Sequence, residues 1–148
     1  MITYQVEPYS SCIVEMKLLY PQHYDELSVT KGFQLEPNYQ KYYALEAANA
    51  LHVITCRKDA KLIGYIMFIV DTHMHYMSCL TAFEDIYFII KEERRGRTGI
   101  KLFQFAEQYL KSINVNRVIY STKTHLDNSK LFEYLGYTLI EKVYSKTF

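Results

Sequence analysis

The spacing of hydrophobic residues alternates between a period of about two and one of about 3.6, so strands and helices are predicted to follow one another along the chain. In the first fifty residues this pattern predicts a strand over 2–6, a helix over 11–20, a short helical piece over 22–27, a loop over 28–36 and a helix over 37–49. We expect Pro21 to break or restart the first helix, because proline has no amide hydrogen to donate. Pro37 opens the last of these helices, where that missing hydrogen costs nothing.

The period changes again in the rest of the chain. The changes predict strands over 51–57 and 61–73 joined by a turn at 58–60, an ambiguous segment over 75–81, a strand over 83–90, a helix over 98–112, a strand over 117–122, a short helix over 127–135 and one or two strands over 137–146. Gly136 directly follows the short helix, at the position where glycine commonly ends one. This order is typical of an α/β domain with a mixed sheet, built from hairpins at the front and crossovers at the back.

Composition indicates one folded domain over residues 1–148. Hydrophobic residues make up 49% of the chain and charged residues 22%, as in ordinary globular proteins. The formal net charge is +1, so no overall charge excess favours nucleic acid or an anionic membrane, and we expect neither as a partner. The longest apolar run, Leu62 to Val70, is too short to span a bilayer, and the start has no signal-peptide pattern; we therefore expect a cytoplasmic protein.

The segment from Arg94 to Gly99 has the composition of a phosphate-binding loop. It follows a predicted strand, carries three arginines and two glycines after Glu93, and opens a predicted helix. The first amides of a helix have no intrahelical partner, the helix dipole adds positive charge there, and glycines let a ligand approach the backbone. A solvated basic turn before a surface helix would give the same pattern. The chain has no GxxxxGKS/T motif and no GxGxxG after a first strand, so a Walker-type triphosphatase and a dinucleotide fold are not indicated.

With these residues the chain resembles the GNAT superfamily of acetyl-CoA-dependent N-acetyltransferases. Arg94-Arg-Gly-Arg-Thr-Gly99 is similar to the family's R/Q-x-x-G-x-G/A signature, which follows its fourth strand and opens its third helix. Arg97 stands where the middle glycine belongs, and Gly96 could take its place. Residues 61–68 resemble the family's third strand with its Gly-Tyr pair, and residues 128–137 end in Leu-Gly-Tyr, like the family's closing segment. The short, tyrosine-rich sequence looks most like members encoded by bacteriophages.

The resemblance implies a mixed, mostly antiparallel central sheet of six to seven strands, flanked by about four helices and splayed between the fourth and fifth strands. It also implies acetyl-CoA as cosubstrate, with its pyrophosphate on the amides that open the third helix and its pantetheine paired like an added strand. The residues that it assigns to acetyl-CoA are Phe88, Ile89, Ile90, Arg94, Arg95, Gly96, Arg97, Thr98, Gly99, Ile100 and Asn128.

Acetyl transfer to an amine needs a base for the attacking ammonium, and two adjacent carboxylates are the leading candidates. Many family members keep a carboxylate near the beginning of the fourth strand, where this chain has Glu84 and Asp85; alternation lets only one of them face the cleft. His75 is the next candidate, because histidine titrates nearer neutral pH and His75 shares a strand face with His73. The two histidines lack an evident third ligand, and the three cysteines form no CxxC pair, so we expect no metal.

The acid that protonates the departing thiolate is where the sequence departs from the family. The usual tyrosine lies four residues before the closing glycine, and Phe132 stands there instead. Tyr134 points about 200° away on the same helix, Ser129 lies one turn earlier, and His125 stands where the family often has asparagine. These three residues and water remain alternatives. We expect F132Y to be tolerated and to raise turnover or leave it unchanged.

The resemblance implies acetyl transfer to a primary amine of a small molecule or a protein. The alternative is a CoA-binding, catalytically weak interaction protein that docks on a host protein through its tyrosine-rich first fifty residues. Phe132 favours this alternative slightly, whereas the carboxylates on the fourth strand favour the enzyme. The acceptor is not readable from the sequence. Pairing of the last strands between subunits would give a homodimer, and a phage origin would place the protein in the host cytoplasm.

Overall fold

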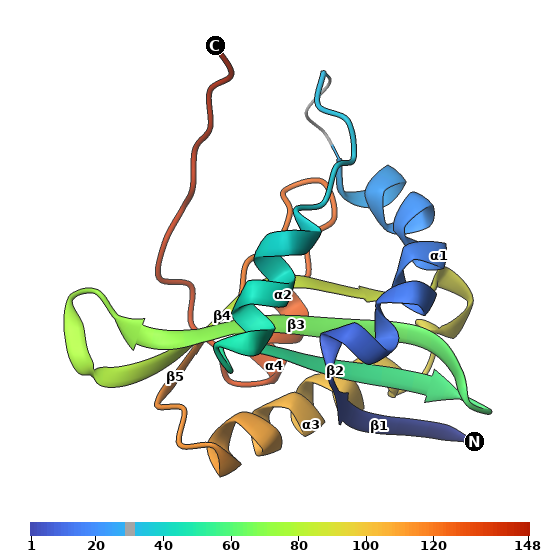
Figure 1. Ribbon diagram of the computed structural model, residues 1–148, viewed down its shortest axis with the longest axis horizontal. Coiled ribbons are helices and arrows are strands. Elements are labelled where there is room, and N and C mark those ends of the chain that lie inside the picture. Colours follow the sequence, from blue (N-terminus) through green and yellow to red (C-terminus); the bar gives the residue numbers. More distant parts are fainter. Residues whose placement is uncertain (29–31) are drawn as a thin grey trace.

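The computed structural model describes residues 1–28 and 32–148, so the loop predicted over 28–36 lies partly outside the described residues. Its elements are β1 (Ile2–Glu7), α1 (Tyr9–Leu27), α2 (Tyr39–Ala47), β2 (Leu51–Lys58), β3 (Lys61–His73), β4 (Tyr76–Ile89), the 3-10 helix η1 (Lys91–Glu93), α3 (Thr98–Ser112), β5 (Arg117–Ile119) and α4 (Ser129–Tyr134). Figure 1 shows how the helices surround the strands. Over this described part of the chain, no helix is both long and apolar enough to cross a membrane.

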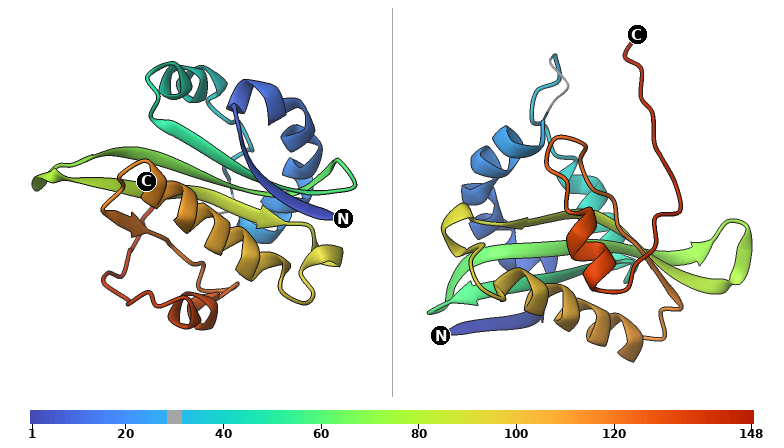
Figure 2. Two further views of the ribbon diagram at one scale, coloured as in Figure 1. Left: turned by 90° about the horizontal axis from the view of Figure 1, so that it is seen from below. Right: turned by 180° about the vertical axis from the view of Figure 1, so that it is seen from behind.

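Five strands form one sheet in the described part of the chain, in the order β1-β2-β3-β4-β5. Neighbouring strands are antiparallel except β4 and β5, which are parallel, so the sheet is mixed as predicted. Figure 2 shows α1 and α2 on one face of the sheet and α3 and α4 on the other. Two buried clusters fill these interfaces, one around Phe68 and Leu102 on the α3 side and one around Tyr65 and Met16 on the α1 side.

The sheet opens between β4 and β5. These strands pair only from Thr81 with Arg117 to Phe83 with Ile119, whereas β4 continues to Ile89. Among the described residues, the β5 side of β4 therefore has no strand partner from Glu84 onward. We call this opening, between residues 84–89 and the chain after β5, the V. It is the splay that the resemblance implies.

Helix α1 is continuous, so the prediction that Pro21 ends it was wrong. Pro21 lies inside the helix on its exposed side, and Tyr20 and His23 are buried on the same face as Ile13 and Met16. Packing of that face against the sheet stabilises helical backbone on both sides of the proline, and this outweighs the one hydrogen bond that proline cannot make. The continuous helix carries residues 23–27 to the V.

The C-terminal segment forms no strand, so the predicted strands over 137–146 and a sheet of six to seven strands were wrong. Residues 138–148 have no regular secondary structure, and Leu139, Val143 and Phe148 are exposed. Figures 1 and 2 show the segment running away from the sheet. Its apolar side chains have the composition of a strand, but a strand also needs a neighbouring backbone. The ambiguous segment over 75–81, in contrast, belongs to β4, which begins at Tyr76.

Candidate active site

A bulge in β4 separates the two candidate carboxylates. Met67 pairs with Ile86 and Phe68 with Glu84, so Asp85 is an extra residue with no partner on β3. Bulges redirect side chains and are frequent beside active sites. Glu84 faces the chain that follows β5, and Asp85 faces α2, as alternation along the strand predicts for neighbouring residues.

Glu84 joins the two sides of the V. Its Oε2 accepts hydrogen bonds from the Ser121 backbone N–H at 3.1 Å and from the Ser121 hydroxyl at 3.0 Å. Burial raises the pKa of Glu84, and the hydrogen bonds from Ser121 oppose that shift. Glu84 therefore connects β4 to the segment after β5 at the point where the two strands stop pairing.

Asp85 is linked to the helical layer on the opposite face. Its Oδ2 accepts a hydrogen bond of 2.6 Å from the Tyr42 hydroxyl of α2. Burial, followed by the hydrogen bond and the charge of Asp85, raises the pKa of Tyr42 well above the ordinary value for tyrosine, so the hydroxyl stays protonated and donates. The carboxylate has further oxygen lone pairs for another donor.

The open edge of β4 offers the backbone groups of Tyr87 and Ile89. The Ile90 N–H donates to Ile63 O at 2.9 Å, and in an antiparallel pair alternate residues point their backbone groups to the same side. Phe88 and Ile90 therefore pair with β3, and Tyr87 and Ile89 face the V. Of the predicted pantetheine partners only Ile89 has this orientation; Tyr87 was missed, because the register of a strand is not visible in one sequence.

The start of α3 provides free amides. Gly96 adopts a left-handed conformation at φ +66°, and Gly99 lies in the first helical turn. Within the described residues, the backbone amides from Arg95 to Ile100 have no hydrogen-bond acceptor, because no turn of α3 precedes them. A Cβ built on Gly99 would meet only Ile89 Cδ1, at 3.7 Å, so packing of the protein does not require glycine there.

The three arginines of this loop differ in their surroundings. The Nε of Arg94 donates to Ile89 O at 2.7 Å, and its guanidinium pairs with Glu26 at the end of α1 and lies over the Phe88 ring. Arg95 and Arg97 are exposed, and neither makes an ion pair with a described residue. Arg94 therefore holds α1 to the loop, and Arg95 and Arg97 are free to bind an anion.

Thr98 and Ile100 are less exposed than Arg95 and Arg97. Thr98 is buried, its hydroxyl donates to Arg95 O at 3.4 Å, and its carbonyl accepts from the Tyr4 hydroxyl at 3.2 Å. These bonds fix the loop to β1. Ile100 is half-buried.

Tyr87 extends across the V on the Glu84 side. Its hydroxyl accepts a hydrogen bond of 3.0 Å from Asn128 Nδ2 and donates to Ser121 O at 3.3 Å. Burial raises its pKa, so it is protonated at neutral pH. Sequence analysis assigned Asn128 to the site but missed Tyr87, since a tyrosine in an aromatic-rich strand carries no local signal of this contact.

The candidate acids on α4 are placed differently from the expectation. Phe132 is buried and packs against Tyr87, Tyr120 and other aromatic rings, so a hydroxyl added by F132Y would enter that cluster. Tyr134 is 65% exposed. The Ser129 hydroxyl donates to Asp127 at the start of the helix.

The histidine candidates also lie apart from the carboxylates. His75 is in the exposed turn between β3 and β4, at the opposite end of β4 from the V, and it is not on a strand with His73 as predicted. His125 Nε2 lies 2.8 Å from the backbone oxygen of Glu26. No group of three or more potential metal-ligating side chains occurs in the part of the chain that the structure describes.

Comparison with known protein families matches the chain to one of them. The model of the Acetyltransferase (GNAT) family matches residues 16–137. The chain belongs to this family. No curated protein sequence matches the chain.

Solved structures show the same GNAT fold at low identity. They include the ribosomal-protein-alanine N-acetyltransferase from Brucella melitensis biovar Abortus 2308, with a TM-score of 0.74, 13% identity and coverage of 100% of this chain and 99% of that one. A predicted acetyltransferase with acetyl-CoA from Clostridium acetobutylicum has a TM-score of 0.73 at 9% identity, covering 99% and 96% of the two chains. An aminoglycoside acetyltransferase from an uncultured soil metagenomic sample has a TM-score of 0.71 at 13% identity, covering 99% and 97%.

Proposed function

We propose that this GNAT-family protein transfers the acetyl group of acetyl-CoA to a primary amine. The observation that carries the proposal is the V. Here β4 and the loop that follows it bring together an unpaired strand edge, the free amides at the start of α3 and the carboxylate of Asp85. The family match over residues 16–137 supports the same reaction class.

The residues of the V fit acetyl-CoA. The amides from Arg95 to Ile100 and the exposed charges of Arg95 and Arg97 suit its pyrophosphate, and the room at Gly99 allows close approach. The backbone groups of Tyr87 and the N–H of Ile89 suit the amides of its pantetheine arm, whereas Ile89 O already accepts a hydrogen bond from Arg94. Acetyl-CoA supplies an activated thioester carbonyl.

Asp85 is the base in this proposal. The new bond joins the amine nitrogen to the acetyl carbonyl carbon while the carbon–sulfur bond breaks. A primary ammonium loses two protons overall, of which one ends on the CoA sulfur and one in solvent. The carboxylate of Asp85, oriented by Tyr42, accepts the proton from the ammonium, and Glu84 joins the two sides of the V through Ser121.

Tyr87 is the acid in this proposal. Its hydroxyl is protonated; beside the V it accepts a hydrogen bond from Asn128 and donates one to Ser121 O, which it gives up when the proton passes to the sulfur. Tyr87 protonates the departing thiolate, which Phe132 cannot do because it has no hydroxyl. Because a thiol has an ordinary pKa of about 8.5, the departing thiolate needs only modest help.

Binding of acetyl-CoA to wild-type protein and to Gly99→Glu, measured by calorimetry, tests the function. A carboxylate at Gly99 should abolish binding, because it places negative charge where the pyrophosphate would lie. Ser112→Glu adds the same charge at the other end of α3 and should bind normally. Equal binding by wild type and Gly99→Glu would overturn the site, and the wild-type affinity should fall as salt rises.

The alternative, a CoA-binding interaction protein that docks on a host protein, predicts a different result. It predicts acetyl-CoA binding without thiol release over a broad panel of amines. Asp85 and Tyr42, joined by a hydrogen bond beside the V, favour the enzyme, because a docking protein has no need of that pair.

A further inference from the structure

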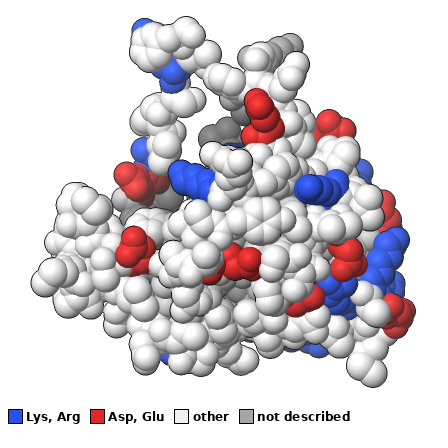
Figure 3. All heavy atoms as spheres, viewed as in Figure 1, with Lys and Arg blue, Asp and Glu red and all other residues white. Residues whose placement is uncertain are grey.

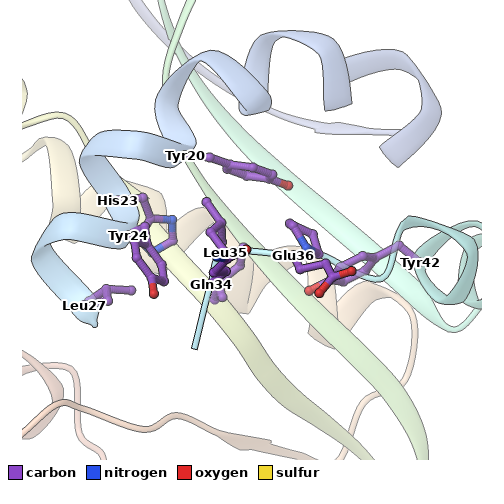
Figure 4. Close-up of a pocket in the computed structure, with 10 residues that line it drawn as sticks. Tyr20, His23, Tyr24, Leu27, Gln34, Leu35, Glu36 and Tyr42 are labelled. Carbon is purple, nitrogen blue, oxygen red and sulfur yellow. The ribbon is translucent and has the colours of Figure 1, made fainter. Parts of the chain in front are cut away.

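A pocket of about 290 Å³ lies beside the V, between α1, the segment that leads into α2, and β4. Figure 4 shows Tyr20, His23 and Tyr24 of α1 on one side, Tyr42 of α2 on the other, and residues 34–36 between them. The volume is at the lower end of the roughly 300–1,000 Å³ typical of small-molecule sites. A compact ligand fits such a space better than a folded protein surface does.

The pocket lies next to Asp85, the residue that we propose as the base. Tyr42 and Ile86 line it, Tyr42 donates its hydrogen bond to Asp85, and Ile86 is the next residue along β4. A ligand in the pocket can therefore reach the bulge of β4, where the V begins. This continuity distinguishes the pocket from an isolated surface hollow.

The walls are mainly aromatic and aliphatic. Tyr20, Tyr24 and Tyr42 contribute rings, Leu27 and Ile86 contribute aliphatic surface, and Glu36 is the carboxylate among the lining residues. Aromatic faces attract ammonium groups, and a carboxylate pairs with one. The Tyr24 hydroxyl donates to Phe33 O, which holds the connecting segment against α1.

His23 has one polar atom without a partner beside the pocket. It is buried, its Nδ1 lies 2.7 Å from the Tyr65 hydroxyl, and its ring stacks on Phe88 at 4.6 Å. Its Nε2 is buried and has no hydrogen-bond partner in the described part of the chain. Burial, followed by the charges of Arg94 and Lys123, lowers the pKa of His23 to about 4, so the ring is neutral and does not repel a cation.

We infer that this pocket binds the acetyl acceptor, and that the acceptor is a compact primary amine with one ammonium group on an aromatic or similarly apolar body. That the bound amine is the acetyl acceptor rests on the proposed function. A polyamine or an aminoglycoside would bring further ammonium groups into apolar walls, where unpaired charges are costly. On the face that Figure 3 shows, acidic side chains are scattered and form no single patch that could receive them.

Calorimetry with 2-phenylethylamine tests the pocket on the full chain in the presence of CoA. The controls are 2-phenylethanol, which lacks the ammonium, spermidine, which has several, and a short peptide with a free N-terminus. We expect 2-phenylethylamine to bind about tenfold or more tightly than each control. Thiol release from acetyl-CoA should follow the same order.

Matched variants locate the binding. Glu36→Gln and Tyr24→Leu should each weaken binding of 2-phenylethylamine about tenfold and leave acetyl-CoA binding unchanged. Glu141→Gln and Tyr144→Leu make the same changes in the exposed C-terminal segment and should leave both unchanged. Glu36 is itself exposed, so its variant should fold normally.

The outcomes separate the two proposals. Tighter binding of 2-phenylethanol, spermidine or the peptide than of 2-phenylethylamine, or equal binding by Glu36→Gln, would overturn the inference and leave acetyl transfer standing. Absence of acetyl-CoA binding would overturn the proposed function. Binding of 2-phenylethylamine would still show whether the pocket takes a compact amine. Binding and acetylation of 2-phenylethylamine, both lost with Glu36 or Tyr24, would support both.

Discussion

Two adjacent residues of β4, Glu84 and Asp85, have opposite surroundings although their side chains have the same chemistry. Glu84 accepts hydrogen bonds from Ser121 across the V, and Asp85 accepts one from Tyr42 on the other face of the sheet. Neighbouring residues of a strand point to opposite faces, and the bulge leaves Asp85 without a partner on β3. At the scale of single residues, position in the sheet therefore decides which carboxylate can meet an amine.

Asp85→Asn should lower kcat by roughly 10² to 10⁴, because the amide cannot accept a proton from the ammonium. The Kd for acetyl-CoA should change little. Glu84→Gln keeps an oxygen for the Ser121 amide and should lower kcat by less than about tenfold. Steady-state kinetics with an acetylated amine measures both variants; equal losses would contradict the separate roles.

Tyr87→Phe should lower kcat about tenfold without a change in KM for acetyl-CoA, because the variant loses the proton donor but keeps the ring. The loss should shrink above about pH 8.5, where the thiolate is the stable product and needs no proton. Tyr144→Phe, an exposed tyrosine in the C-terminal segment, is the matched control. If Tyr87→Phe kept the wild-type rate and pH profile, another group would be the acid.

His23 should make the fold sensitive to mild acid. Its pKa is about 4 in the folded protein and near 6.5 when exposed, so between these values the unfolded chain binds more protons. The contribution of neutral His23 is present above pH 6.5 and is lost as the pH falls to about 4, by up to roughly 3 kcal/mol. Urea unfolding at pH 7 and pH 4.5 should show a smaller loss for His23→Asn than for wild type. The exposed His75→Asn should behave like wild type; an unchanged pH dependence in His23→Asn would refute the assignment.

At the scale of elements, the close approach of β3 and β4 beside the V depends on a glycine. A Cβ on Gly64 would lie 2.7 Å from Phe88 O and 2.8 Å from Ile89 Cγ1. These β4 residues lead directly to the loop at the start of α3, so the Gly-Tyr pair of β3 sets the position of the V.

Gly64→Ala should lower the free energy of unfolding by about 1–3 kcal/mol, because the new methyl group overlaps β4 backbone. It should also weaken acetyl-CoA binding by shifting Ile89. Gly99→Ala is the matched control for stability: its Cβ has room, so the free energy of unfolding should stay the same or rise, since alanine favours helix more than glycine does. Denaturant unfolding compares the two, and equal stabilities would show that β3 and β4 can separate without cost.

At the scale of the whole molecule, the last ten residues are separate from the folded body. Leu139, Ile140, Val143, Tyr144 and Phe148 are all exposed, and none makes a hydrogen bond or ion pair with the described core. β5 has a strand neighbour on one side only within the described sheet. We propose that these two features pair between two copies of the chain, which would cover the exposed apolar residues.

Deletion of residues 139–148 should leave the free energy of unfolding of the monomer unchanged, because the apolar side chains of the segment are exposed and it makes no hydrogen bond or ion pair with the described core. Sedimentation velocity should show a concentration-dependent dimer for the full chain and a monomer for the deletion. A substantial loss of stability in the deletion at low concentration would mean that the segment packs on its own subunit, and equal sedimentation of the two would exclude the dimer.

The sequence by itself determined the elements whose local pattern agrees with their surroundings. The bounds of β3 and α3 match the predicted 61–73 and 98–112, and the glycines and arginines before α3 predicted the loop with free amides. Period and helix capping are local properties, so the residues themselves carry them. The motifs of β3, the loop and α4 likewise indicated the family that the comparison shows.

Tertiary structure decided what depends on residues distant in sequence. Packing against the sheet kept α1 helical through Pro21, and the lack of a neighbouring backbone left the C-terminal segment outside the sheet. The register between β3 and β4 turned Asp85 toward Tyr42 and Tyr87 toward Asn128, contacts that span about forty residues each. A one-residue bulge reverses the face that a side chain occupies, and only the paired strand fixes where that bulge lies.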